Sequence, residues 1–91
     1  MAVVRTSSPD NKWVYYGSKW RETFTFGAAD TAFTCLSGHK IEGAMLKVWE
    51  PNLGVSLWPT LDYTVSTDGT NTLTLTAAFG VSGTLVIENV E

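Results

Sequence analysis

Apolar and polar residues alternate along several short stretches of the chain, which is the pattern of strands that bury one face. The clearest stretch is Thr72–Ala77, where two leucines and an alanine alternate with three threonines. Trp20–Phe26 repeats the pattern except at Glu22, which falls among the apolar positions. Because a lone carboxylate is rarely buried, we expect Glu22 to occupy an edge position.

Two further stretches are apolar on both faces. Met45–Trp49 is interrupted only by Lys47, and Thr84–Val90 contains the run Leu-Val-Ile at 85–87. This pattern predicts central strands, or strands whose outer face is covered by a partner. Together they present more apolar surface than one small core needs, so we expect other chains to complete their burial.

Turn-forming residues recur about every ten positions, as in sandwiches and barrels. The Asp68-Gly69 turn predicts a hairpin between Asp62–Ser66 and Thr72–Ala77. The loop at 80–83, bounded by glycines, predicts a second hairpin between Thr72–Phe79 and Thr84–Val90. The end of the chain is therefore expected to form a three-stranded meander.

The whole pattern predicts one small all-β domain without a convincing helix. We expect an antiparallel β-sandwich, of jelly-roll or immunoglobulin-like type, or a β-barrel, with about 7–8 short strands. Residues 12–91 would form this domain. Residues 1–11 would form either an extended arm that docks on a neighbouring subunit or an ordinary first strand and loop.

Composition narrows the classes of partner. The 91 residues are 44% apolar, which is typical of a folded chain. Nine acidic against six basic residues give a net charge of -3 without a cationic cluster, so nucleic acid and anionic membranes are poor partners. Cys35 is the only cysteine, and a small domain without disulfides is stabilised by close packing or by association. We therefore expect a homo-oligomer made in a reducing cytoplasm.

Little in the sequence indicates catalysis. Cys35 precedes the only histidine, His39, by four positions, and a thiol–imidazole pair is the sharpest catalytic possibility. A buried, inert Cys35 is the simpler interpretation. The carboxylates are scattered, and calcium loops and phosphate-binding glycine loops are absent from the sequence. We predict a protein that is not an enzyme and that uses no metal or cofactor.

Aromatic residues are the most unusual chemical feature of the chain. They can pack in the core, bind a subunit or partner, or form a flat platform for carbohydrate. All three interpretations remain open, with core packing as the default. The interface candidates, including two valines of the N-terminal arm, are Val3, Val4, Trp13, Tyr15, Tyr16, Trp49 and Trp58.

Three segments suggest a family: the run Thr-Phe-Thr-Phe-Gly-Ala-Ala-Asp-Thr at 23–31, Lys-Ile-Glu-Gly-Ala-Met at 40–45, and the threonine-rich closing stretch from 63 to 88. In these segments the chain resembles small β-sandwich structural proteins of tailed-bacteriophage virions, in particular capsid decoration (cement) proteins and head or tail accessory proteins. The resemblance lies in the general β-hairpin character of these segments, and it assigns no functional role to any residue.

The resemblance implies a virion protein that binds the major capsid protein in many copies and reinforces the shell. The N-terminal arm and the aromatic face would be the binding parts. The alternative is a carbohydrate-binding β-sandwich that presents tryptophans to a glycan.

Overall fold

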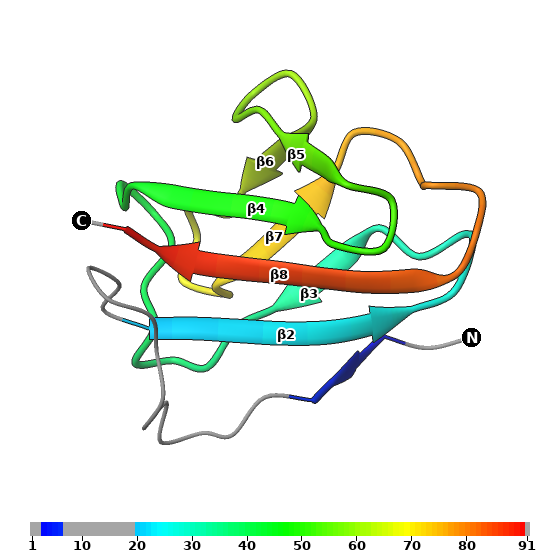
Figure 1. Ribbon diagram of the computed structural model, residues 1–91. Coiled ribbons are helices and arrows are strands. Elements are labelled where there is room, and N and C mark those ends of the chain that lie inside the picture. Colours follow the sequence, from blue (N-terminus) through cyan, green and yellow to red (C-terminus); the bar gives the residue numbers. More distant parts are fainter. Residues whose placement is uncertain (1–2, 7–19, 91) are drawn as a thin grey trace.

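Two antiparallel sheets face each other in the computed structural model, which describes residues 3–6 and 20–90. Figure 1 shows the strands, and these described residues form no helix. The larger sheet has the order β1-β2-β8-β4-β5 and the smaller one β3-β7-β6. The strands are β1 (Val4–Arg5), β2 (Trp20–Phe26), β3 (Ala32–Thr34), β4 (Leu46–Glu50), β5 (Val55–Leu57), β6 (Tyr63–Val65), β7 (Thr72–Leu75) and β8 (Gly83–Asn89). The predicted all-β sandwich is confirmed.

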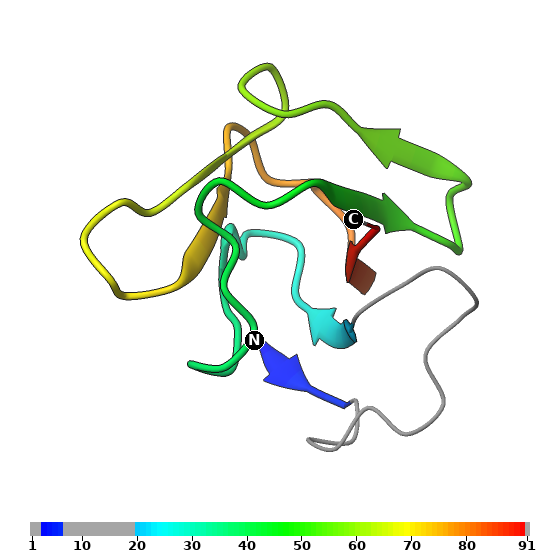
Figure 2. The same ribbon diagram turned by 90° about the vertical axis from the view of Figure 1, so that its left-hand side faces the viewer.

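The core lies between the two sheets and is rich in aromatic rings. Phe33 of β3 meets Phe24 and Phe26 of β2 edge-on, with ring centroids 5.5 and 5.8 Å apart. Phe79, which follows β7, stacks on Phe26 at 5.2 Å. Edge-to-face pairs of this kind add to the stability that area burial provides. Aromatic packing therefore joins the two layers that Figure 2 shows from the side.

The central strand of the larger sheet is β8, which pairs with β2 on one side and β4 on the other. Leu85 and Ile87 point into the core, and Val86 on the opposite face is also buried. The continuous apolar run therefore belongs to a central strand, which is the first of the two predicted alternatives. The expectation that other chains complete its burial is wrong for this strand, because β2, β4 and the smaller sheet leave Leu85, Val86 and Ile87 buried within one chain. β4 is likewise an inner strand, between β8 and β5.

One of the two predicted hairpins is wrong. β6 and β7 pair through Thr64 and Thr74, so the hairpin at Asp68-Gly69 is confirmed. β7 and β8, however, lie in different sheets. The glycine-bounded loop crosses from one layer to the other, with Gly80 at φ 82° donating its N–H to the Ala28 carbonyl oxygen at 3.0 Å. A short connection between two strands favours a hairpin, but it does not determine whether the second strand joins the same sheet or the facing one.

The prediction for Glu22 is also wrong. β2 lies between β1 and β8, and Glu22 points inward with 0% of its surface exposed. Its carboxylate is matched by cationic and N–H groups, described below. A buried carboxylate is tolerated where such partners exist, which the strand pattern alone does not reveal.

Candidate interaction surface

The loop between β5 and β6 is held closed by its own backbone and by an aspartate. The Trp58 N–H donates to Asp62 Oδ2 at 2.8 Å, and the Asp62 N–H donates to the Trp58 carbonyl oxygen at 2.8 Å. Within the loop, the Thr60 N–H donates to the Tyr63 carbonyl oxygen at 2.8 Å. Aspartate side chains commonly organise turns in this way.

A threonine at the end of β7 ties the same loop to the smaller sheet. The Thr76 N–H donates to the Asp62 carbonyl oxygen at 2.9 Å. Its hydroxyl lies 3.1 Å from the carbonyl oxygens of both Leu61 and Asp62, to which it can donate. These bonds leave the loop little conformational freedom to lose when it binds.

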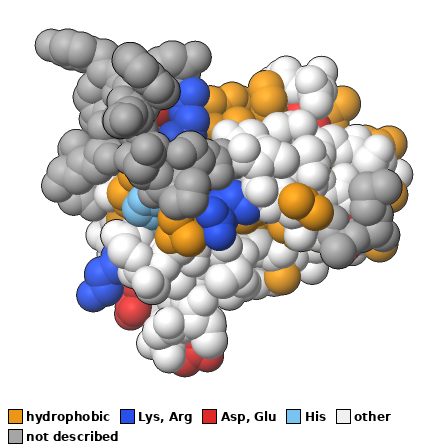
Figure 3. Space-filling model, turned by 90° about the horizontal axis from the view of Figure 1, so that it is seen from below, with side chains coloured by type: hydrophobic (Ala, Val, Ile, Leu, Met, Phe, Trp, Pro, Cys, Tyr) orange, Lys and Arg blue, Asp and Glu red, His pale blue; other side chains and the backbone are white. Residues whose placement is uncertain are grey.

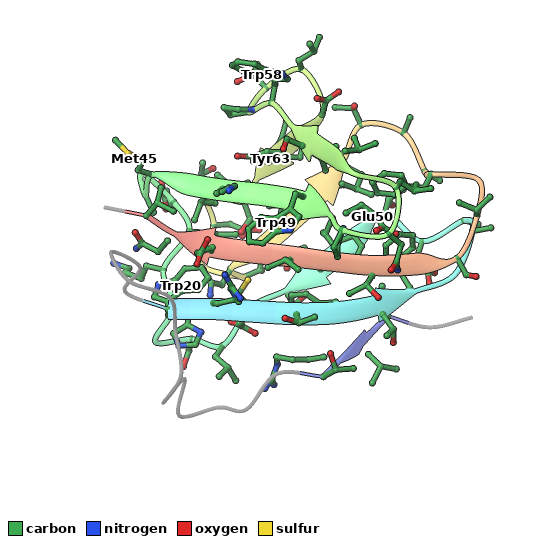
Figure 4. All side chains as sticks on the ribbon, in the orientation of Figure 1. Trp20, Met45, Trp49, Glu50, Trp58 and Tyr63 are labelled. Carbon is green, nitrogen blue, oxygen red and sulfur yellow. The ribbon has the colours of Figure 1, made fainter. Side chains whose placement is uncertain are left out.

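This fixed loop nevertheless holds two large apolar side chains in water. Trp58 is 69% exposed and Leu61 is 73% exposed, and we call this pair the β5–β6 loop patch. Figure 4 shows Trp58 at the outer end of the loop, directed away from both sheets. Tryptophan is enriched at the energetic centres of protein interfaces, and a rigid apolar tip is suited to such a centre.

A cleft of about 310 Å³ lies beside the loop, between the two sheets. Its walls are uncharged and come from the end of the loop, from β6, from β4 and from the turn before β4. β5 pairs with β4 only from Val48 onward, so β5 does not cover the start of β4. Leu46, at that start, borders the cleft. Met45, 63% exposed, lies at the same end of β4. The lining residues are Ile41, Gly43, Ala44, Leu46, Pro59, Thr60, Tyr63, Thr64 and Val65.

Trp49 occupies a different environment from Trp58. It lies half-buried on the outer face of β4, with Lys47 Nζ 4.9 Å and Arg21 Cζ 5.3 Å from the ring centroid. Arg21 also bonds Glu88 Oε2 at 3.0 Å, across the β2–β8 pair. Two cations already contact this ring. Trp49 is therefore a poorer platform for an external ligand than Trp58.

The sequence candidates are thus spread over the molecule. Val3 is half-buried and packs against the core, whereas Val4 is 54% exposed on the edge strand β1. Trp13, Tyr15 and Tyr16 lie outside the described residues. Sequence reasoning missed Leu61 and Met45, because a single exposed leucine or methionine has no distinctive pattern. The Trp-Pro-Thr-Leu-Asp segment at 58–62, an aromatic turn closed by aspartate, is the signal that could have found Leu61.

A buried polar cluster surrounds Glu22 on the opposite side of the sandwich. Oε2 of Glu22 accepts a hydrogen bond from the Leu36 N–H and contacts His39 Nδ1, both at 2.8 Å. Oε1 lies 3.2 Å from Arg5 Nε. The His39 ring stacks on Trp20 with centroids 4.7 Å apart, and it reaches the surface seen in Figure 3. The cluster joins β1, β2 and the segment after β3.

Asn71 holds the segment that carries His39. Its Nδ2 donates to the carbonyl oxygens of Leu36 at 2.7 Å and His39 at 3.0 Å, and its Oδ1 accepts the Ile41 N–H at 3.2 Å. Asn71 has φ 58°, a conformation that asparagine adopts more readily than most residues. The position of His39 is therefore set by the turn before β7, far along the chain.

Cys35 lies close to this cluster, but as an inert thiol. Burial raises the pKa of the Cys35 thiol, and the carboxylate of Glu22 raises it further. The thiolate, which is the nucleophilic form, is thus disfavoured. His39 Nδ1 binds Glu22 instead. Among the described residues, no group of three or more His, Cys, Asp or Glu side chains is placed to hold a metal ion.

Comparison with protein-family models, with curated proteins and with solved structures gives no match for this chain. No helix in the described ranges is long and apolar enough to cross a membrane.

Proposed function

We propose that this protein is a non-enzymatic structural protein that binds a larger assembly in many copies through the β5–β6 loop patch. The observation that carries the proposal is the hydrogen-bonded loop that keeps Trp58 and Leu61 in water. Exposure of two large apolar side chains on a fixed loop favours binding, because the apolar area is buried with little loss of loop entropy.

The assembly proposed is the virion of a tailed bacteriophage, with the major capsid protein as partner and a decoration or cement role. The resemblance of segments 23–31, 40–45 and 63–88 to such proteins supports this choice. A net charge of -3 agrees with an exterior position, away from packaged DNA. Many copies on one shell allow each contact to be individually modest, because multivalency multiplies affinity.

Co-sedimentation with assembled shells of the phage whose genome encodes the chain tests the proposal. The unmodified chain is expected to sediment with the shells. Trp58→Ser and Leu61→Ser should each weaken binding at least about tenfold, as expected for residues at the centre of an interface. Val81→Ser is the matched control, since Val81 is also an exposed apolar side chain but lies in the loop before β8. Failure of the unmodified chain to bind any shell, or equal losses in all three variants, would overturn the proposal.

Carbohydrate binding is the second candidate, and the exposed ring of Trp58 favours it. A sugar stacks on one aromatic face, so Trp58→Phe should retain binding and Leu61→Ser should leave it unchanged. A protein interface requires both side chains. Tryptophan fluorescence titrated with soluble polysaccharides separates the two functions: a response lost in Trp58→Ser but retained in Leu61→Ser supports the carbohydrate site.

A further inference from the structure

Among the described strands, β1 pairs with β2 alone, along one edge. Val4 pairs with Thr25 and Arg5 with Phe24 of β2, and Thr6 donates its N–H to the Thr23 carbonyl oxygen at 2.7 Å. On its other side a cleft of about 300 Å³ separates β1 from β3, lined by Val3, Arg5, Phe24, Ala32 and Thr34. β1 is thus a two-residue edge strand at the margin of the sandwich, visible below β2 in Figure 1.

β1 nevertheless supplies a charge to the buried cluster. Glu22 is fully buried, and Arg5 Nε lies 3.2 Å from its Oε1. Val3 packs against the core beside it. Without β1, Oε1 of Glu22 would lose this cation and only Oε2 would keep its partners, and removing a cationic partner from a buried carboxylate is strongly unfavourable. The edge of β2 is therefore a receptor site that is incomplete until a strand carrying an apolar residue and a cation fills it.

The covalent connection does not determine which copy provides that strand. Thr6 lies opposite Thr23, three residues from Trp20, so Thr6 and Trp20, which flank segment 7–19, are only about 11 Å apart. A connection of this length can extend to roughly 45 Å. The longest extent of the molecule is 30 Å. Residues 3–6 can thus reach the same edge on a neighbouring copy.

We propose that β1 is an exchangeable strand: residues 3–6 of one copy bind the β2 edge of a second copy and complete its Glu22 site. Every contact of β1 is retained in the exchanged form, because the two chains are identical. The chain's own β1 competes for the β2 edge at an effective concentration on the order of millimolar. At protein concentrations well below this value each chain keeps its own β1, and at concentrations near it the chains exchange the strand. This inference deepens the proposed function and rests on its many-copy arrangement.

Cysteine pairs placed on the β1–β2 ladder test the exchange. Val4 and Thr25 are exposed partners in the ladder, within the usual range for a disulfide. The single variants Val4→Cys and Thr25→Cys are mixed, refolded together in reductant at about 1 mM, the concentration at which exchange competes, and then oxidised. The native Cys35 is buried and stays protected after refolding.

The exchanged strand should give a mixed disulfide between the two variants. Val4→Cys mixed with Thr64→Cys is the control, because Thr64 is an exposed strand residue of the other sheet. The matched mixture should give at least about tenfold more mixed dimer than the control, because only ordered contact raises the effective concentration. Equal yields, or no mixed dimer while the double variant Val4→Cys/Thr25→Cys closes within one chain, would overturn the exchange.

The same experiment separates this inference from the proposed function. Trp58→Ser, introduced into both cysteine variants, should leave the mixed disulfide unchanged, because Trp58 lies in the loop at the opposite edge of the sandwich. Shell binding without mixed disulfide would overturn strand exchange alone. Mixed disulfide without shell binding would overturn the virion role alone.

Discussion

The carboxylate of Glu50 occupies the space that a side chain at Gly83 would need. A Cβ at Gly83 would lie 2.1 Å from Glu50 Oε2. That oxygen accepts the Thr84 N–H at 3.1 Å, while Oε1 accepts the N–H groups of Asn52 and Leu53. Glu50, at the buried end of β4, thus closes the β4–β5 turn and fixes the start of β8. At position 83 only glycine leaves room for the Glu50 carboxylate.

Gly83→Ala should therefore destabilise the fold by about 2–4 kcal/mol, because it both overpacks the site and displaces a buried hydrogen bond. Gly38→Ala is the control, since a Cβ at Gly38 meets nothing within 4 Å, and its effect should stay within about 0.5 kcal/mol. Urea unfolding measures both. Equal changes in the unfolding free energy for the two substitutions would show that Glu50 moves aside without loss of stability.

Glu22→Gln should lower stability by about 3 kcal/mol, because it removes the buried charge that Arg5 and His39 share. The loss should be accompanied by faster hydrogen exchange at the Thr6 amide, which directly follows β1 and donates to the Thr23 carbonyl oxygen of β2. Glu42→Gln, at an exposed position, should change stability by less than about 0.5 kcal/mol. An unchanged Thr6 exchange rate would show that β1 is held without the ion pair.

Alkaline pH should weaken the fold through Cys35. Burial raises the folded-state pKa of this thiol above its ordinary 9.0, so the unfolded chain ionises first. The contribution of the protonated thiol to the free energy of unfolding is then fully present below pH 9. This contribution falls as the pH rises above 9, with a limiting slope of about 1.4 kcal/mol per pH unit. Tyr63, whose pKa burial also raises, adds to the loss above 10.0.

Cys35→Ser removes the thiol titration and should flatten the decline in unfolding free energy between pH 9 and 10. Urea unfolding at pH 8, 9 and 10 provides the comparison. The slope, rather than the absolute stability, is the relevant quantity, because the substitution also alters packing. An equal slope in both proteins would mean that Cys35 ionises in the folded chain as it does in the unfolded one.

The two tryptophans Trp20 and Trp58 should differ strongly in their contribution to stability. Trp20 is buried and stacks on His39, so Trp20→Ala should cost about 3–5 kcal/mol. Trp58→Ala should change stability by less than about 0.5 kcal/mol, because the ring is mostly in water. Thermal and urea unfolding measure both. A large loss on Trp58→Ala would indicate that the loop patch serves folding instead of binding.

The strand pattern alone predicts much of the fold. Alternating apolar positions mark the strands and the faces that must be buried, whether the same chain or another one covers them. Thr72–Leu75 and Tyr63–Val65 pair through a short Asp-Gly turn, which local geometry decides. The two apolar faces of the run 84–90 predict either a central strand or a strand covered by another chain, and the structure shows the central strand β8. Its place beside β2 and β4 instead of β7 depends on contacts between residues that are distant along the chain.

The candidate surfaces were harder to predict, since they depend on what surrounds each side chain. Trp49 and Trp58 look alike in sequence, yet Lys47 and Arg21 contact one ring while the other stands in water. Sequence by itself determined the all-β class, the Asp68-Gly69 turn and the apolar strands, which follow from local periodicity and turn chemistry. Only the tertiary structure decided the layer of β8, the partners of Glu22 and the exposure of Trp58, because burial and charge pairing depend on residues that folding brings together from distant parts of the chain.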